Sequence, residues 1–229
     1  MAAESRPAVA ATGVGVVYAS ASGNVRALAD VDVEISSGVT AIVGPSGSGK
    51  SSLLRVLGLI DRPSAGAVRV EDRDLNTLRA AERRRLRRER IGYLFQRPAD
   101  NLVAHLSAAE NLRLSVRIRG EANADPLGLL ESLGLADRAD HPVEGLSGGE
   151  QQRVAVAAAV NGGPAVVIAD DPTDELDADS GNRLLEVILM LARGGTTFAI
   201  ATHDPAAIVV ASRVVRLRHG LVERDSSEA

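Results

Sequence analysis

The sequence predicts an α/β fold in which helices cover a mostly parallel sheet. Three observations support this prediction. A glycine-rich loop near residue 44 separates an apolar run from a helical pattern, strand and helix patterns alternate again after about residue 163, and the stretch before that point is mostly helical. Alternating strands and helices are typical of a parallel sheet with helices on its faces. We therefore expect an α/β core that carries a helical insertion.

Length and composition restrict the possibilities further. A chain of 229 residues forms one large domain or two small ones. We expect a single domain at 8–226, with the α/β core at about 8–96 and 163–226 and a helical subdomain at about 97–162. Aromatic residues make up 2% of the chain, so aliphatic side chains must build the core. The net charge of −4 gives no overall attraction to nucleic acid, and the lack of cysteine excludes disulfides and thiolate chemistry.

The elements expected before residue 97 are mainly strands. A turn at Ser36-Ser37-Gly38 favours an antiparallel, hairpin-rich edge at the N-terminus. Strands are expected at about 8–18, 28–35, 39–43, 67–70 and 91–95. Helices are expected at about 51–57 and 77–89.

After residue 97 the pattern becomes helical, and strands return near residue 165. Helices are expected at about 107–119, 126–134, 148–161, 180–193 and 205–211. Strands are expected at about 165–169, 196–201 and 213–218. The residues from Arg224 to Ala229 are interpreted as a polar tail.

Neither a secretory signal nor a membrane span is visible in the sequence. The segment Met1 to Arg6 has no cationic stretch followed by a long apolar one. The longest apolar run, 187–192, belongs to an amphipathic helix that begins near Ser180, and it is far shorter than the ~20 residues that cross a bilayer. If the protein serves a membrane process, we expect the membrane-spanning part in another chain or in a missing one.

The predicted helix at 77–89 lies in a cationic segment. Seven arginines stand between Arg79 and Arg90, together with Glu82 and Glu89. A nucleic-acid patch is one interpretation. The segment has no interleaved aromatic residues and the chain is acidic overall, so a solvated helix face is favoured and no nucleic-acid partner is expected.

The glycine-rich loop holds the only lysine of the chain. Lys50 is one of 26 basic residues, and the other 25 are arginine. The run Gly44 to Ser51 fits the pattern G-x-x-x-x-G-K-[ST] of a phosphate-binding loop, in which backbone N–H groups and the lysine hold phosphates and the last hydroxyl holds Mg²⁺. The loop follows a strand and opens a helix, as that function requires. A merely flexible glycine loop is the alternative interpretation.

A pair of carboxylates follows the apolar strand at 165–169. Asp170 stands where parallel strands of such sheets meet their ligands, so we expect it in the magnesium shell, with Asp171 one residue closer to the terminal phosphate. The alternative is a helix N-cap with a negative neighbour.

The octapeptide Leu146 to Arg153, Leu-Ser-Gly-Gly-Glu-Gln-Gln-Arg, combines a capping serine with two glycines whose amides are open to an anion. At this point the sequence resembles the ATP-binding cassette family, whose signature has this pattern and completes the ATP site of the opposite subunit in a head-to-tail dimer. The resemblance covers nearly the whole chain and implies a P-loop NTPase fold of the ABC type.

The resemblance also implies roles for single residues. Tyr18 is similar to the aromatic residue that stacks on adenine, although a core tyrosine is an alternative. Gln96 is similar to the glutamine that senses magnesium and the attacking water, and His203 to the histidine that contacts the γ-phosphate. No role is expected for the other histidines, His105, His141 and His219. The implied catalytic residues are Asp171, His203 and Gln96. The implied metal ligands are Ser51, Gln96 and Asp170. The residues expected on the nucleotide are Tyr18, Gly44, Pro45, Ser46, Gly47, Ser48, Gly49, Lys50, Ser51, Ser52, Ser147, Gly148, Gly149 and Glu150.

The sequence departs from the family pattern at three places. Asp171 stands where the family normally has the glutamate that acts as general base, and shortening the side chain by one C–C bond moves its carboxylate by ~1.5 Å. The following loop has Asp174 and Glu175 where small or polar residues are usual, and Ala158 replaces a common arginine. A slow ATPase or a degenerate half of a heterodimer is expected.

The implied function is the ATP-binding and ATP-hydrolysing subunit of a transporter. ATP and Mg²⁺ are the expected cofactors, and a separate membrane permease and a second cassette, in a homodimer or heterodimer, are the expected partners. The location implied is cytoplasmic, on the inner face of the membrane. The stretch from Phe95 to Asn111 resembles lipoprotein-release and macrolide exporters. A cell-division type regulator without transport and a binding-only half-site remain alternatives.

Overall fold

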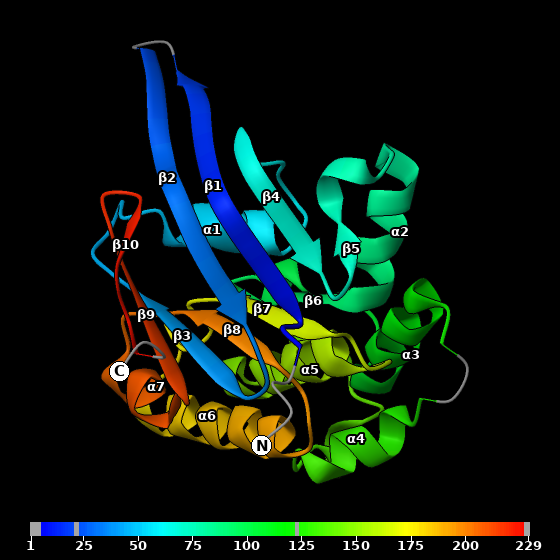
Figure 1. Cartoon of the computed structure of the whole chain (residues 1–229). Helices are drawn as coiled ribbons and strands as arrows, with labels where there is room; N and C mark the ends of the chain where they lie inside the picture. The colour runs from blue at the N-terminus through cyan, green and yellow to red at the C-terminus, as the bar shows by residue number, and fades with distance from the viewer. Residues whose placement is uncertain (1–5, 21–22, 122–123, 227–229) are drawn as a thin grey trace, which may run out of the picture.

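The computed structural model describes residues 6–20, 23–121 and 124–226, which form two sheets with helices between and around them (Figure 1). Met1 to Ser5, which carry most of the segment judged to lack a secretory signal, lie outside the described residues, as do Ser227 to Ala229 of the expected polar tail.

The larger sheet has six strands in the order β10-β9-β3-β8-β7-β6. The four pairings from β9 through β6 are parallel, and β10 alone pairs antiparallel, with β9. The predicted mostly parallel α/β core is therefore confirmed. The strands of this sheet are β3 (Val39–Val43), β6 (Ile91–Leu94), β7 (Val166–Asp170), β8 (Phe198–Ala201), β9 (Arg213–Arg218) and β10 (Leu221–Asp225).

Helices and a second sheet cover both faces of this sheet, which explains its uninterrupted apolar runs. In β7, Val166 and Ile168 face one core cluster, whereas Val167 and Ala169 face another. A strand buried on both faces has no polar side to alternate with. The helices are α1 (Lys50–Leu57), α2 (Ala80–Arg90), α3 (Ala108–Arg119), α4 (Pro126–Ser132), α5 (Gly148–Val160), α6 (Ala178–Arg193) and α7 (Pro205–Val210). Single 3₁₀ turns are Leu75–Thr77, Pro98–Asp100, Ala136–Arg138 and Val143–Gly145.

The expected antiparallel strands form a sheet of their own, in the order β2-β1-β4-β5, rather than an edge of the core sheet. Its strands are β1 (Val9–Ser20), β2 (Gly23–Ile35), β4 (Ala65–Val70) and β5 (Arg73–Asp74). The prediction for β2 began too late, at residue 28. Residues 23–27 are mostly exposed and lack an alternating pattern, and they are strand because they pair with the end of β1.

α1 is fixed between the two sheets (Figure 1). Leu53, Leu54, Val56 and Leu57 are fully buried and belong to the same core cluster as side chains of β1, β2 and β7. Burying each such side chain stabilises the fold by ~1.5–3 kcal/mol. The loop that precedes α1 is therefore anchored to a rigid helix.

The described residues between β6 and β7 are helices and turns, and α3, α4 and α5 enclose a separate apolar cluster that includes Leu112, Leu130 and Val154. Buried Asn111 organises the start of α3, since its side chain accepts from Val103 N at 2.8 Å and donates to the Ser107 carbonyl at 3.0 Å. The division into a core and a subdomain at 97–162 stays a prediction.

The interpretation of Arg224 and Asp225 as part of a polar tail is wrong, because both belong to strand β10 (Leu221–Asp225). Asp225 is 9% exposed and its carboxylate forms a two-pronged ion pair with Arg213 of β9, with 2.8 Å between Nε and Oδ1. A buried bidentate pair of this kind compensates the desolvation of both charges. The partner of Asp225 lies on another strand, so the sequence of the C-terminal segment alone gives no indication that this carboxylate is buried.

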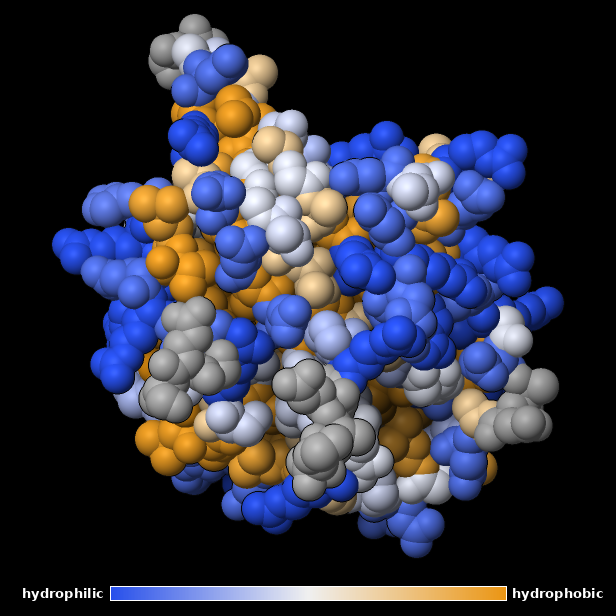
Figure 2. Space-filling view, viewed as in Figure 1, coloured by the Kyte–Doolittle hydropathy of each residue, from blue (hydrophilic) through white to orange (hydrophobic). Residues whose placement is uncertain are grey.

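The arginine-rich helix α2 buries only Leu86. Figure 2 shows hydrophilic side chains gathered over this helix. Arg85 pairs with Glu89 at 2.7 Å on the helix, and Arg90 pairs with Glu71 of the neighbouring turn. The helix is thus the solvated, ion-paired face that the charge pattern favours. Among the described residues, no helix combines the length and the apolar character that crossing a membrane requires.

Candidate functional site

The glycine-rich loop lies at the carboxyl end of β3 and turns directly into α1. Gly49, the residue before the helix, has a φ of 107°, and a Cβ there would lie 2.6 Å from the Ala27 carbonyl oxygen. Only glycine fits this position, because it lacks the Cβ and tolerates the left-handed region. Among the described residues, no side chain caps α1. Its first N–H groups are therefore free to bind an anion at the positive end of the helix dipole.

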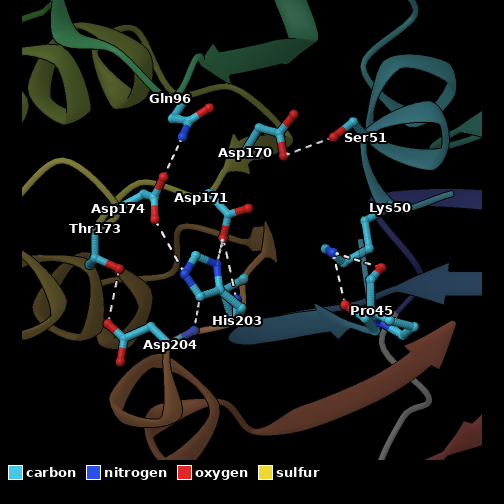
Figure 3. Close-up of polar contacts among 12 residues, drawn as sticks. Pro45, Lys50, Ser51, Gln96, Asp170, Asp171, Thr173, Asp174, His203 and Asp204 are labelled. Carbon is cyan, nitrogen blue, oxygen red and sulfur yellow. Dashed lines mark hydrogen bonds and ion pairs between the residues drawn. The ribbon is translucent and has the colours of Figure 1, made fainter. Parts of the chain in front are cut away.

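Two side chains in the loop differ in their access to a phosphate group. The Lys50 ammonium donates to the Gly44 carbonyl at 2.9 Å and is 3.4 Å from that of Pro45, so it lies folded over the loop (Figure 3). Ser48 is 2% exposed, and its hydroxyl is a buried polar atom without a hydrogen-bond partner. The buried Ser48 hydroxyl does not face solvent, so the groups left for phosphate oxygens are the Lys50 ammonium and the open amides.

Ser51, on the first turn of α1, meets Asp170 at the end of β7. The hydroxyl donates to the carboxylate at 3.3 Å (Figure 3). Burial raises the pKa of Asp170, the nearby charge of Asp171 raises it further, and the Ser51 hydrogen bond opposes these effects. A divalent cation beside this carboxylate would favour its charged form. A hydroxyl and a carboxylate match the oxygen ligands of Mg²⁺, which fills the rest of its shell with water.

The third expected metal ligand, Gln96, makes its side-chain hydrogen bond with another residue. The side-chain amide of Gln96 donates to Asp174 at 2.5 Å (Figure 3). The expected metal ligands are therefore one hydroxyl, one amide and one carboxylate. In the described part of the chain, no three Asp, Glu or His side chains form a metal-binding group.

Asp171 and His203 face each other between β7 and β8. The Asp171 carboxylate lies 3.1 Å from the His203 ring Nδ1 and accepts from the His203 backbone N–H at 3.3 Å. The backbone of Asp171 donates to the Ala201 carbonyl and has a φ of 42°, a left-handed conformation in which aspartate is over-represented. The loops after two neighbouring parallel strands thereby present one carboxylate and one imidazole at the same edge of the sheet.

These groups share a pocket of about 640 Å³. Its lining includes the loop residues from Gly44 to Ser52 except Ser48, together with Asp171 and His203. Tyr18, Val25 and Arg26 from the antiparallel sheet form the opposite wall. The core interpretation of Tyr18 is wrong. The residue is 38% exposed, and its hydroxyl donates to Asp61 at 3.1 Å.

The signature segment begins α5 with an exposed serine cap. The Ser147 hydroxyl accepts from the Glu150 N–H at 3.3 Å, and the Glu150 carboxylate accepts from the Ser147 N–H at 2.8 Å. Hydrogen bonds from the Ser147 backbone and hydroxyl, followed by one from Arg138, hold the pKa of Glu150 below its usual range. Ser147, Gly148, Gly149 and Glu150 do not line the pocket of their own chain. The expected nucleotide-binding residues therefore divide into two separate surfaces.

Two residues of the site were missed by the sequence interpretation. Gln152, 1% exposed on α5, donates to the Pro172 carbonyl at 3.0 Å and so connects the signature helix with the turn after β7. Asp174 contacts both Gln96 and the His203 ring. Asp174 was noted only as an unusual acid, and nothing in its sequence neighbourhood indicates these partners.

Comparisons with known proteins agree with this geometry. The family described as ABC transporter matches residues 28–174. The chain is 40% identical over 230 residues to the macrolide export ATP-binding/permease protein MacB 1/2 of Paracoccus denitrificans, covering 98% of this chain and 34% of that protein. It is 44% identical over 207 residues to MacB of Burkholderia thailandensis, covering 88% of this chain and 31% of that protein. The chain thus spans about a third of the length of these curated relatives.

A solved structure is similar over almost its whole length. The ATP-binding cassette MJ0796, in a dimeric post-hydrolysis state bound to ADP and Pi, superposes with a TM-score of 0.83 at 32% identity, covering 95% of this chain and 97% of that one. The phosphate loop, the strand-end carboxylates and the signature helix lie in a fold of the same type. The chain therefore belongs to the ABC transporter family, as an ATP-binding cassette.

Proposed function

We propose that this chain hydrolyses Mg-ATP to drive a membrane permease, and that two cassettes pair head to tail around two nucleotides. The observation that carries the proposal is the loop before α1, where Lys50 and the loop glycines line the pocket and no side chain among the described residues caps the first N–H groups of α1. ATP supplies the phosphates for these groups, and Mg²⁺ is assigned to Ser51 and Asp170, with Gln96 as the third ligand.

The chain's own residues have defined parts in this proposal. Lys50 and the loop amides bind the β- and γ-phosphates, and Tyr18 on the opposite wall stacks on the base. Asp171 acts as the base that orients the attacking water, and His203 contacts the γ-phosphate. The carboxylate of Asp171 is already within 3.1 Å of the His203 ring, so both can act on one γ-phosphate without rearrangement of the strands.

The head-to-tail arrangement is supported by the position of the signature. Ser147 and Gly148 are exposed and lie outside the pocket of their own chain, although they begin a helix whose N-terminus is suited to an anion. A second cassette brings its signature to the pocket in this arrangement. The names of the curated relatives support a permease as the partner of the cassette. We place the chain at the cytoplasmic face of the membrane, through that permease.

Complementation of two inactive variants tests the proposal. Lys50→Ala removes the phosphate lysine and leaves the signature intact, whereas Ser147→Arg blocks the signature and leaves the phosphate loop intact. Each variant alone is expected to be inactive. In a head-to-tail dimer, an equal mixture recovers about a quarter of the native ATPase rate, because half of the dimers are mixed and each holds one complete site. No recovery in the mixture contradicts the proposed pairing, and native activity in either variant alone contradicts the assigned sites.

A binding-only half-site is the second candidate, and Asp171 is the observation that favours it. This carboxylate is one carbon shorter than the usual base, and its Oδ1 is held by the His203 backbone and ring. In that case turnover depends on a second, different cassette that supplies a glutamate. The purified chain then binds Mg-ATP with native affinity but shows no turnover alone.

A further inference from the structure

Asp174 joins two loops of the site through one carboxylate. Its Oδ2 accepts from the Gln96 amide at 2.5 Å, and its Oδ1 lies 3.2 Å from Nε2 of the His203 ring (Figure 3). Gln96 follows β6 and His203 follows β8, on either side of the strand that leads to Asp174. The backbone N–H of Asp174 also donates to the Asp171 carbonyl, so the turn that carries it is closed.

The His203 ring is thereby held from both sides. Nδ1 faces Asp171 at 3.1 Å and Nε2 faces Asp174 at 3.2 Å. Carboxylates only accept hydrogen bonds, so the ring donates to both only when both nitrogens carry a proton. A γ-phosphate that binds His203 must take one of these two nitrogens. Since Asp171 also holds the backbone of His203, Asp174 is the partner that can be exchanged.

The same carboxylate fixes the orientation of the Gln96 amide. With an acid opposite, only the amide nitrogen can point toward Asp174, because the amide oxygen would place two acceptors together. The oxygen of Gln96 is then the atom left for a cation.

We propose that Asp174 is a positioning residue that competes with the γ-phosphate for the His203 ring while it orients the Gln96 amide. The proposal rests on the proposed role of His203 at the γ-phosphate. ATP must displace Asp174 from Nε2 to gain its own contact, whereas ADP, which has no γ-phosphate, leaves the contact in place. The chain therefore favours ATP over ADP less strongly than it would without this acid.

Calorimetric titration with Mg-ATP and Mg-ADP tests this. Asp174→Asn keeps the size of the side chain and removes its charge. Because Asp174 and His203 are both partly exposed, their contact is weak, and we expect the ratio of ATP to ADP affinity to rise about two- to fivefold. A general loss of negative charge raises the affinity for both nucleotides equally, so a change in the ratio of ATP to ADP affinity reports the γ-phosphate contact alone. Glu175→Gln, which removes the neighbouring exposed acid, is expected to leave the ratio unchanged.

A second readout needs no nucleotide. The chain has four histidines, so ¹⁵N NMR resolves their ring nitrogens, and His203→Ala identifies the signals of this ring. Asp174→Asn is expected to shift the Nε2 signal of His203, and Glu175→Gln is not.

Combination with His203→Ala separates the possible failures. If His203→Ala lowers the ATP to ADP ratio and Asp174→Asn then has no further effect, competition for the ring is supported. If His203→Ala leaves the ratio unchanged, the proposed role of His203 is wrong. If His203→Ala lowers the ratio but Asp174→Asn alone does not raise it, Asp174 is not a competitor and this inference is overturned, while the proposed function stands.

Discussion

The buried side-chain amide of Gln152 donates to the carbonyl of Pro172 at 3.0 Å, and this contact joins the signature helix to the turn after β7. Both residues are shielded from solvent, since Gln152 is 1% exposed and Pro172 is buried. The hydrogen bond links the helix that is proposed to meet a partner's nucleotide with the turn that carries Asp171 and Asp174. Movement of either one is expected to reach the other.

Gln152→Met tests how much this hydrogen bond contributes to the free energy of unfolding. The variant keeps the length of the side chain but leaves the Pro172 carbonyl without its donor, and we expect the free energy of unfolding to fall by ~1–2 kcal/mol in urea titrations. The loss is limited because the Gln152 carbonyl oxygen, a buried acceptor without a partner, disappears too. Gln151→Met is the control. The Gln151 amide donates to the Leu146 carbonyl in the neighbouring loop, so this variant does not remove a contact with the turn after β7. Equal native stability in the Gln152 variant would show that the contact contributes nothing.

Lys50→Arg is expected to lower the affinity for Mg-ATP at least about tenfold, because a planar guanidinium replaces the compact ammonium that lies over the loop. The Lys50 ammonium donates to the Gly44 carbonyl at 2.9 Å, a contact made by a compact point charge that a planar guanidinium does not reproduce. Calorimetry gives the affinity, and Arg113→Lys on the exposed face of α3 serves as the conservative control. Unchanged affinity in Lys50→Arg would remove this residue from the phosphate site.

Ser48→Ala is expected to separate stability from binding. Removing a buried hydroxyl that has no partner raises the free energy of unfolding of the nucleotide-free chain by ~0.5–2 kcal/mol. The same change is expected to leave the affinity for Mg-ATP within about twofold of the native value, because the hydroxyl is buried and Ser48 does not line the pocket. Ser46→Ala, at an exposed position of the same loop, is expected to change stability by less than ~0.5 kcal/mol. A stability loss in Ser48→Ala would mean that the hydroxyl has an internal partner.

Asp171→Glu is expected to raise single-turnover ATP hydrolysis about ten- to a hundredfold, because the longer side chain moves the carboxylate closer to the attacking water. Asp171→Asn is expected to abolish hydrolysis and to leave nucleotide binding intact, since Lys50 and the loop are unchanged. The φ of 42° at this position suits aspartate and asparagine better than glutamate, so Asp171→Glu is expected to lower stability by ~1 kcal/mol. Equal rates in the native chain and both variants would exclude Asp171 from the mechanism.

Glu150 gives the signature helix a pH dependence. The folded pKa is lowered, chiefly by hydrogen bonds from Ser147, so the stabilisation is fully present above the unfolded value of ~4.3 and is lost as the pH falls through the folded pKa. Glu150→Gln is expected to reduce the free energy of unfolding by ~0.5–1.5 kcal/mol at pH 7, with the difference from the native chain shrinking below pH ~4. Glu144→Gln, an exposed neighbour, is the control. A difference that does not depend on pH would contradict the capping role of the charge.

The sequence alone determined the features whose chemistry is local. The phosphate loop is one continuous segment, and its glycines, lysine and hydroxyl act on the same ligand, so their order reveals their purpose. The apolar run Val166 to Ala169 predicted a strand, and the serine cap at Ser147 predicted the start of α5. In each of these, the residues that decide the structure are sequence neighbours.

The tertiary structure decided the features that depend on partners far apart in the chain. Gln96 and Asp174 are 78 residues apart, and Arg213 reaches Asp225 only because β9 and β10 pair side by side. A polar side chain satisfies its hydrogen bonds with whatever group lies beside it in space, and a short polar segment carries no signal of which group that is. For the same reason, Arg224 and Asp225 of β10 were interpreted from the sequence as part of a polar tail. The partners of Asp174 become evident only in the tertiary structure, where three parallel strands bring their loops to one edge of the sheet.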